Sequence, residues 1–591
     1  MDVTKYLDLR PAPRAIFDAL AERRDLVRYM VPDAGSYRPV TFGEVAREIE
    51  DVALFLAADG HRPADRGAVF AHNSVAWMSA ALALQTADGT MVPLYASSTT
   101  EQAAYVLEHS DARVVFVDSD ALLRRVLGAL PSLPALARIV LMDARADAPR
   151  TLAAMRAAGE TTPTDADALP KVISWVDARA KGRSVADSDP AALARLLDAI
   201  SLDAPAIMLY TSGTSGQPKG VPLTHRNVGV NGRDWLEVLA PLLEEGMVDL
   251  LWLPMSHVFG FGEACIGNTL GWTSYLGDPQ TVMARLPEVK PTAFMSVPAV
   301  WEKLAQAAMR ADDASERERL LAEATGGRLR FCLSGGAGLK REVKELFHSL
   351  GILIIEGYGL TEASPTLTMN RPGAFRFDSV GLPFPSVQLR LAEDGEILAK
   401  AGSVFLGYHK DPVASAEAFT EDGWLKTGDV GVFTEDGFLQ IVDRKKDILV
   451  TTGGKNIPPA NIEQRFADDS LFQHVVVYGD NQKYLVAGVW VNPLVADPAL
   501  AELEGDRGDA LRALIEARIA KVNAALASYE SIKRFAVMEP ALSVEGGHLT
   551  PTLKVKRKAV YAAFKAEFEA LYEAPSKPSA ATKPASKPEA Q

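Results

Sequence analysis

The segment of this sequence with the clearest chemical potential is a loop of glycine, serine and threonine followed by a lysine, in AIMLYTSGTSGQPKGVPLTHRN at 206–227. We expect a buried strand before this loop and a helix capped by Thr224 after it. Glycines let backbone N–H groups approach phosphate oxygens, hydroxyl groups add donors, and Lys219 adds positive charge. The loop is not a Walker loop, because Pro218 stands where counting from Gly213 requires the second glycine. The sequence therefore predicts a phosphate-binding loop of another kind in preference to a flexible linker.

Four further motifs lie downstream, and their residue types suit a nucleotide and a metal ion. Tyr358 offers an aromatic face for an adenine, and Thr361 can donate to a phosphate or a carboxylate. Glu362 is a hard oxygen ligand suited to Mg²⁺, and Asp429 is an acceptor-only carboxylate that can take both hydroxyls of a ribose. Each of these residues alone could belong to an ordinary turn, so the argument depends on the motifs together. The motifs are EGYGLTEASP at 356–365, GWLKTGDVG at 423–431, DRKKDILVTTGGKNIPPANIE at 443–463 and LTPTLKVKR at 549–557.

Taken in this order, the five motifs resemble those of the adenylate-forming superfamily, which includes acyl-CoA synthetases, luciferases and peptide-synthetase adenylation domains. The resemblance extends from about residue 30 to residue 572 and is most like the long-chain fatty acid–CoA ligases. Leu553 precedes Lys554 where many relatives have a glycine, and this departure is typical of the long-chain ligases.

The resemblance implies a nucleotide site built from four of the motifs and the loop SGGA at 334–337. It implies that Glu362 holds Mg²⁺ and that ATP, Mg²⁺ and CoA are the cofactor and co-substrates. The residues that it assigns to ATP or AMP are Thr211, Ser212, Gly213, Thr214, Ser215, Gly216, Lys219, Gly335, Gly336, Ala337, Glu356, Gly357, Tyr358, Gly359, Thr361, Asp429 and Arg444.

Lys554, Thr361 and His257 are the catalytic residues that the resemblance implies. The choice of Lys554 over its neighbours Lys556 and Arg557 rests on the alignment alone. His257, in LPMSHVFGFG, occupies a position near the acyl carboxylate in relatives, although a histidine between apolar residues is most often a packed core residue. The glycines that follow it could leave room for an alkyl tunnel or could serve close helix packing.

The resemblance also implies a two-step reaction with a domain rotation. A fatty carboxylate attacks the α-phosphorus of ATP and expels pyrophosphate, and Lys554 stabilises the developing charge. The carboxy-terminal domain then rotates about the hinge residue Lys446 and brings a CoA-binding loop of Gly453, Gly454 and Lys455 to the site. A plain glycine turn is the alternative for this loop. The CoA thiolate finally attacks the acyl carbon and releases AMP.

Composition excludes several other classes of protein. The 591 residues, about four times the roughly 150 of a typical domain, include 62 basic and 76 acidic side chains, a net charge of −14, which argues against a non-specific nucleic-acid binder. The two cysteines, Cys265 and Cys332, are too few for a disulfide framework. The amino-terminal residues lack the apolar core of a signal peptide, and no apolar run reaches the ~18 residues of a transmembrane helix. We therefore expect a cytoplasmic protein, peripheral to the inner face of the membrane if its substrate partitions into lipid.

Hydrophobic patterning predicts an α/β protein. Short apolar runs alternate with helical patterns through the first 360 residues, as in RGAVFAHN followed by VAWMSAALALQ, and the pattern becomes shorter and more antiparallel over 380–442. We expect a large N-terminal AMP-binding adenylation domain at 1–443, with layered α/β subdomains and a β-rich subdomain. A small mobile C-terminal α/β domain at 444–572 and a disordered Pro/Ala/Lys/Ser tail at 573–591 should follow.

The sequence thus predicts a long-chain fatty acid–CoA ligase that acts on a fatty acid and CoA. One alternative keeps the adenylation step and passes the acyl group to an acyl carrier protein. A second, less favoured alternative is a non-catalytic nucleotide-binding protein on the same fold, and a kinase or Walker-type ATPase is disfavoured by the loop spacing. The preferred chain length and the oligomeric state, a homodimer included, stay open.

Overall fold

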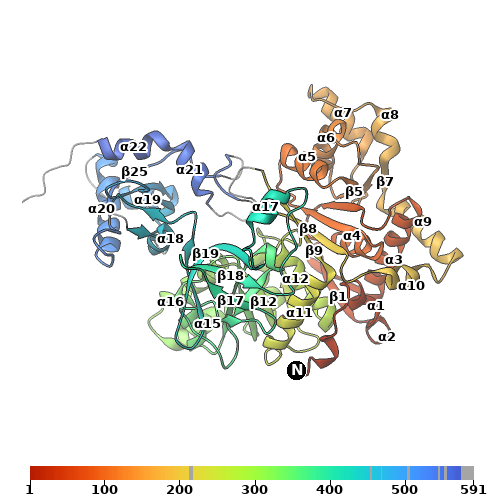
Figure 1. Ribbon diagram of the computed structural model, residues 1–591, viewed down its shortest axis with the longest axis horizontal. Helices are drawn as coiled ribbons and strands as arrows, with labels where there is room; N and C mark the ends of the chain where they lie inside the picture. The colour runs from red at the N-terminus through yellow and green to blue at the C-terminus, as the bar shows by residue number, and fades with distance from the viewer. Residues whose placement is uncertain are drawn as a thin grey trace, which may run out of the picture. The chain divides into compact units, whose positions relative to one another are not determined.

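A computed structural model of the chain describes residues 1–211, 217–452, 455–467, 469–501, 506–543, 546–550 and 555–573 (Figure 1). The chain forms two compact units. The first comprises Met1–Thr427 and Gly431–Ile441, and the second comprises Gly428–Val430 and Val442–Gln591. The predicted tail lies outside the described residues from residue 574 onward.

A seven-stranded sheet in the order β7-β6-β5-β3-β4-β8-β9 holds the strand that leads into the predicted phosphate loop. Its neighbouring strands are parallel except for the antiparallel pair β8 and β9. Each of the strands β3 to β7 is followed in sequence by a helix, as expected for α/β units. The strands are β3 (Arg66–Phe70), β4 (Thr90–Leu94), β5 (Ala112–Val117), β6 (Arg138–Leu141), β7 (Val172–Ser174), β8 (Pro205–Thr211) and β9 (Lys219–Thr224). The main helices of this region are α3 (Phe42–Ala58), α4 (Val75–Thr86), α5 (Thr100–His109), α6 (Asp120–Ala129), α7 (Ala148–Ala157), α9 (Trp175–Ser188) and α10 (Ala192–Ala199).

A nine-stranded sheet in the order β16-β15-β14-β13-β12-β10-β11-β1-β2 forms the second layer of the first unit. The six neighbouring strands β14, β13, β12, β10, β11 and β1 are parallel. At the two edges of the sheet, β2, β15 and β16 pair antiparallel with their neighbours. The strands are β1 (Val27–Asp33), β2 (Ser36–Thr41), β10 (Val248–Leu251), β11 (Thr273–Leu276), β12 (Ala293–Ser296), β13 (Phe331–Ser334), β14 (Ile354–Gly359), β15 (Thr366–Met369) and β16 (Leu382–Pro383). The main helices are α11 (His225–Leu239), α12 (Val258–Leu270), α13 (Val282–Val289), α14 (Pro298–Met309), α15 (Ala314–Thr325) and α16 (Arg341–Ser349).

One hydrophobic core joins the two large sheets. Helix α4 is buried along nearly its whole length, because its sequence is apolar on all sides. Its side chains, with those of α3 and α12, pack in the same cluster as residues of both sheets. Residues of the site strands β8 and β14 therefore belong to one continuous hydrophobic core.

The β-rich region is a four-stranded sheet in the order β17-β18-β19-β20. The strands are β17 (Gln388–Leu391), β18 (Glu396–Lys400), β19 (Leu425–Phe433) and β20 (Leu439–Arg444), and a short helix, α17 (Pro412–Glu417), lies between β18 and β19 in sequence. The boundary between the two units passes through β19 and β20.

The second unit contains a three-stranded sheet of β23 (Phe472–Tyr478), β24 (Leu485–Val491) and β25 (Ile532–Val537). Helices α18 (Pro459–Glu463), α19 (Pro493–Ala501) and α20 (Arg507–Asn523) contribute to one of its two apolar clusters. Helices α21 (Arg557–Ala563) and α22 (Lys565–Glu573) contribute to the other. A mixed α/β architecture with one large and one small domain confirms the predicted fold class.

Candidate functional site

The predicted phosphate loop closes a β-hairpin. Thr211 at the end of β8 pairs with Lys219 at the start of β9, so the loop begins and ends on adjacent strands. The helix capped by Thr224 is confirmed, but strand β9 before it was not predicted. Its apolar pattern is short: Gly220, Val221 and Leu223 are buried, and Pro222, a residue that seldom occurs within a strand, stands between the last two. The loop residues Ser212, Gly213, Thr214, Ser215 and Gly216 lie outside the described residues.

Asn227 attaches helix α11 to a distant part of the chain. Its Oδ1 accepts from the Thr224 N–H at 2.9 Å, and its own N–H donates to Thr224 Oγ1 at 3.0 Å, which completes a capping box. Its Nδ2 donates to the carbonyl oxygens of Gly402 and Val404 at 2.9 and 3.0 Å. The segment 402–409 is thereby held beside the hairpin.

Two of the predicted site residues, Lys219 and Glu362, both contact the side chain of Tyr408. Lys219 Nζ lies 4.7 Å from the centroid of the Tyr408 ring, a cation–π contact. The Tyr408 hydroxyl donates to Glu362 Oε1 at 2.9 Å. Burial, and then the neighbouring Glu362 carboxylate, raise the pKa of Tyr408 above its ordinary value, so the hydroxyl stays a donor. Tyr408 was missed by sequence reasoning, because a tyrosine in a loop produces no periodic pattern.

The motif EGYGLTE places its two glutamates in opposite environments. Glu356, in β14, is 3% exposed, and both of its carboxylate oxygens are occupied. Lys344 Nζ donates to Oε2 and the Leu339 N–H donates to Oε1, both at 2.7 Å. Burial raises the pKa of Glu356 although Lys344 opposes this change. The carboxylate thus ties the loop that contains Gly335, Gly336 and Ala337 to β14, and a nucleotide contact from Glu356 is left to its backbone.

Gly359 shapes the turn that carries Thr361 and Glu362. A Cβ atom at Gly359 would lie 1.8 Å from the carbonyl oxygen of Pro365, so the chain can cross here only without a side chain. Thr361 and Glu362 follow in a short 3₁₀ turn, Thr361–Ala363, and both are half-buried. Gly357 and Tyr358 lie in the same strand, β14, and Tyr358 is half-buried.

His257 caps a helix. It occupies the N-cap position of α12, where its Nδ1 accepts from the Phe259 N–H at 3.2 Å. This position differs from the packed core that was the alternative interpretation. Among the glycines that follow, a Cβ at Gly260 would lie 2.4 Å from the carbonyl oxygen of Pro254, whereas Gly262 has open space beside it.

A buried polar cluster anchors α12 to the sheet. Arg28, in β1, donates to the Ala264 carbonyl at 2.9 Å, to Asn268 Oδ1 at 2.7 Å and to Ser274 Oγ at 2.6 Å. Asp249 and Glu263 complete this Arg28 cluster, and all three ionisable side chains are 1% exposed or less. Burial raises the pKa of Asp249 to about 6 and that of Glu263 well above its ordinary value.

The second unit brings Asp429 and Arg444 together. Arg444 Nε lies 2.8 Å from Asp429 Oδ1, and the Asp429 side chain is 6% exposed against 60% for Arg444. Lys446 is exposed, and Lys455 Nζ lies 5.6 Å from the centroid of the Tyr529 ring. Gly453, Gly454 and Lys554 lie outside the described residues.

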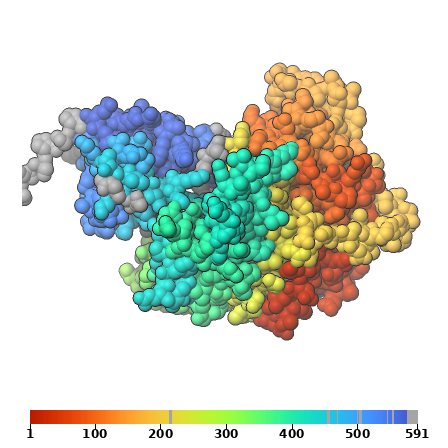
Figure 2. All heavy atoms as spheres, in the orientation of Figure 1, coloured from red at the N-terminus to blue at the C-terminus, as the bar shows by residue number. Residues whose placement is uncertain are grey.

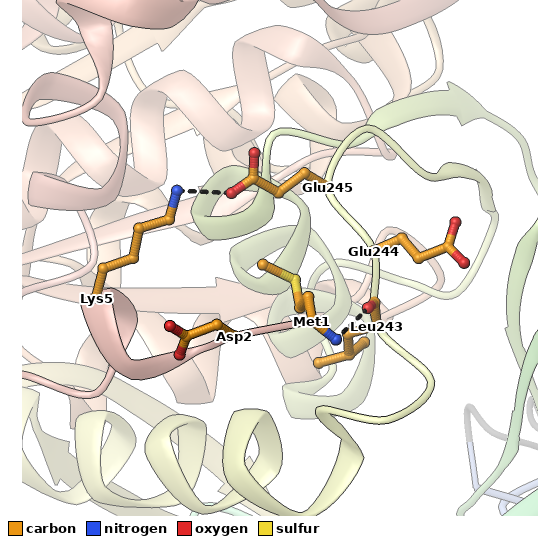
Figure 3. A pocket seen from close by; sticks show the side chains of 6 residues that line it. All are labelled: Met1, Asp2, Lys5, Leu243, Glu244 and Glu245. Atoms are coloured by element: carbon orange, nitrogen blue, oxygen red, sulfur yellow. Dashed lines mark hydrogen bonds and ion pairs between the residues drawn. The ribbon is translucent and has the colours of Figure 1, made fainter.

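Other features of the molecule do not add to these candidates. A pocket at the amino-terminal face is lined by Met1, Asp2, Lys5, Leu243, Glu244 and Glu245, none of them a candidate residue (Figure 3). Across the described part of the chain, no three His, Cys, Asp or Glu side chains gather as a metal-binding group. No helix among the described residues is both long enough and apolar enough to span a membrane.

Comparison with known proteins identifies the family. The profile of the AMP-binding enzyme family matches residues 17–409, and that of the AMP-binding enzyme C-terminal domain matches residues 446–576. The chain belongs to the AMP-binding enzyme family. This confirms the resemblance that the five motifs carried.

Relatives of this AMP-binding enzyme include the long-chain-fatty-acid–CoA ligase FadD15 of Mycobacterium bovis, 32% identical over 94% of this chain and 96% of that protein. The long-chain-fatty-acid–CoA ligase 5 of Rattus norvegicus is 26% identical over 94% of this chain and 87% of that protein. Among solved structures, the adenylation domain of a carboxylate reductase from Mycobacterium chelonae has a TM-score of 0.77 at 23% identity, covering 95% of this chain and 91% of that chain. An anthranilate CoA ligase bound to anthranoyl-AMP has a TM-score of 0.75 at 21% identity, covering 96% and 99%.

Proposed function

We propose that this protein is an ATP-dependent long-chain fatty acid–CoA ligase that forms an acyl-AMP with release of pyrophosphate and transfers the acyl group to CoA. The observation that carries the proposal is the meeting of Lys219 and Glu362 on Tyr408 at the base of the phosphate hairpin, in a chain of the AMP-binding enzyme family. The names of the mycobacterial and rat relatives support the substrate class.

In the first half-reaction the fatty carboxylate attacks the α-phosphorus of ATP. Two anions must meet, so the protein acts by positioning and by charge stabilisation. We assign the β- and γ-phosphates to the hairpin loop and Lys219. No described carboxylate lies within ion-pair distance of Lys219, so its charge is available to a phosphate.

Glu362 and the phosphate oxygens of ATP would hold Mg²⁺. The donors fit this ion, because Mg²⁺ takes one or two protein carboxylates and completes its shell with phosphate and water. Glu362 Oε1 accepts from Tyr408 at 2.9 Å, and Oε2 receives no hydrogen bond from the described residues. When bound, Mg²⁺ neutralises part of the triphosphate charge.

The remaining roles extend the proposal. Tyr358 and Gly335–Ala337 serve the adenine, Thr361 the phosphate or carboxylate, and His257 the acyl carboxylate. In the second unit, Asp429 and Arg444 serve the ribose, while Lys446 acts as hinge and 453–455 receives CoA. We further propose a cytoplasmic enzyme with peripheral membrane contact, because a long acyl chain partitions into lipid.

The decisive test is isotope exchange between pyrophosphate and ATP in the presence of Mg²⁺ and fatty acids of graded chain length. We expect exchange that depends on a long-chain acid, and thioester formation with CoA but not with acyl carrier protein. Product formation only on the carrier would favour the alternative ligase. Absence of exchange with every acid would overturn the proposal.

Lys554 provides a test of the division between the two half-reactions. Lys554→Ala should lower the exchange rate about 10²- to 10³-fold, the usual cost of removing one preorganised donor. It should spare thioester formation from supplied acyl-AMP and CoA. Lys556→Ala, in the same basic run, is the matched control and should retain both activities. Equal loss of both half-reactions in Lys554→Ala would contradict the assignment.

A further inference from the structure

The segment 402–409, which leads from β18 to α17, contacts two separate parts of the candidate site. Its Phe405 N–H donates to the Glu362 carbonyl at 2.8 Å, and its His409 N–H donates to the Gly220 carbonyl at 2.9 Å. Gly220 directly follows Lys219 in the hairpin. In Figure 2 the green-to-teal atoms around α17 form part of the visible surface of the first unit. The segment is therefore a fixed connection between the phosphate hairpin and the Thr361–Ala363 turn.

Within this segment, Tyr408 is the residue whose side chain reaches both charged candidates. Its ring receives Lys219 Nζ at 4.7 Å, and its hydroxyl donates to Glu362 Oε1 at 2.9 Å. The ring is itself fixed, since the Phe405 ring packs edge-on at 4.8 Å and the Tyr408 N–H donates to Ser415 Oγ at 2.8 Å. One rigid side chain thus sets the positions of a cation and a carboxylate.

Lys219 and Glu362 do not form an ion pair with each other. Among the described residues, neither forms an ion pair of 4 Å or less, although both contact the same tyrosine. A flexible lysine and a glutamate this close would neutralise each other if nothing separated them, because opposite charges attract most strongly where water is partly excluded. Tyr408 satisfies one carboxylate oxygen and gives the ammonium group an aromatic face, which leaves charge on both for a ligand.

We propose that Tyr408 is a positioning residue of the adenylation reaction, which holds Glu362 toward the metal-bearing side of the triphosphate and keeps Lys219 from pairing with it. This inference rests on the proposed function and adds to it a residue that acts through two others. The hydroxyl orients the carboxylate, and the ring orients the cation.

Tyr408→Phe separates the two actions, since it removes the hydroxyl and keeps the ring. We expect the pyrophosphate exchange rate to fall about 10- to 100-fold, the range for losing a hydrogen bond to a charged group. Adding Tyr408→Phe to Glu362→Gln should lower the rate less than about threefold further, because coupled residues are not additive. Full multiplication of the two single effects would show that the hydroxyl does not act through Glu362.

ATP binding measured by calorimetry gives a readout independent of turnover. Tyr408→Phe should bind ATP without Mg²⁺ like the wild type, and should lose most of the tightening that Mg²⁺ produces. Tyr408→Leu, which also removes the ring, should weaken ATP binding even without Mg²⁺, since Lys219 is then released. Equal weakening with and without Mg²⁺ in Tyr408→Phe would overturn the proposal, because a merely disturbed fold would lose both.

The matched control is Tyr6→Phe. The Tyr6 hydroxyl donates to Glu245 Oε1 at 2.7 Å, the same bond type in the same unit, and Glu245 lines the pocket of Figure 3. It should leave the exchange rate and ATP binding unchanged. A Tyr408→Phe protein that matches Tyr6→Phe in both assays would overturn the positioning role. A wild type that binds ATP but exchanges with no carboxylic acid would overturn the proposed function instead, and the calorimetric comparison would still test Tyr408.

Discussion

The same three side-chain types, lysine, tyrosine and glutamate, meet twice in the first unit with different results. At the amino-terminal face, Lys5 Nζ lies 4.9 Å from the Tyr6 ring centroid and 2.7 Å from Glu245 Oε1. At the hairpin, Lys219 contacts Tyr408 in nearly the same way, yet no ion pair with Glu362 forms. In the Lys5 group (Lys5, Tyr6 and Glu245) the cation and the carboxylate pair with each other. In the Lys219 group (Lys219, Tyr408 and Glu362) they do not, so both charges are available to a ligand.

The difference teaches that composition does not define a binding site. Lys5 and Glu245 are both half exposed or more, so water screens their charges and the pair forms and breaks freely. The Lys219 group is half-buried and held by backbone hydrogen bonds from 402–409. The backbone hydrogen bonds of 402–409 fix Tyr408 in the position from which its side chain keeps the cation and the carboxylate apart.

The Arg28 cluster extends this comparison to complete burial, and there we expect the largest effect. Arg28→Met leaves the buried carboxyl groups Asp249 and Glu263 without a cation, which should lower the free energy of unfolding by about 3–5 kcal/mol. Arg226→Met is the matched control, because Arg226 pairs with Asp203 at 2.7 Å on the surface and should contribute less than about 1 kcal/mol. Chemical denaturation measures both, and equal losses would show that burial is not the deciding variable.

Lys219→Met should produce the next largest effect, on rate instead of stability. We expect the exchange rate to fall about 10²- to 10³-fold, while the free energy of unfolding changes by less than about 0.5 kcal/mol. Lys5→Met removes a cation from a similar tyrosine ring and should leave exchange unchanged. Similar rates in the two variants would remove the distinction between the two groups.

Glu245→Gln should produce the smallest effect, and it depends on pH. Hydrogen bonds from Lys5 and then from Tyr6 lower the pKa of Glu245 below its ordinary value of 4.5. A lowered pKa in the folded state contributes stability above the ordinary value, and this contribution disappears as the pH falls through the folded value. Thermal unfolding should therefore show a slightly less stable variant at neutral pH and no difference in acid. A difference that grows in acid would contradict this sign.

Much of the fold could be predicted from the sequence because strands such as β3, β4 and β5 are runs of apolar residues followed by a helical pattern. The family could be identified because five motifs of glycines, hydroxyl groups and charged residues occur in a fixed order. Few other protein families combine these motifs in that order. The predicted roles of the site residues, the domain limits at 1–443 and 444–572, and the hinge stay predictions.

Tertiary contacts account for what the sequence did not reveal. Tyr408 lies 189 residues from Lys219 and 46 from Glu362 along the chain, so no local pattern links them. Glu356 and Glu362 look equivalent in EGYGLTE, and only the burial of Glu356 against Lys344 separates a structural carboxylate from an available one. Strand β9 was not predicted from the sequence because its pairing with β8, and not its own alternation of apolar residues, decides its conformation.

Asn227 both completes the capping box of helix α11 and holds the segment 402–409, and this makes its side-chain amide chemically vulnerable. Its Nδ2 donates to the carbonyl oxygens of both Gly402 and Val404, which lie 175 and 177 positions further along the chain. Hydrolysis of this single amide, the ageing reaction of asparagine, would replace a donor with a negatively charged acceptor facing two carbonyl oxygens. The loss of one nitrogen would then loosen the connection that carries Tyr408, so the shelf life of the enzyme would depend on a residue with no predicted part in the reaction.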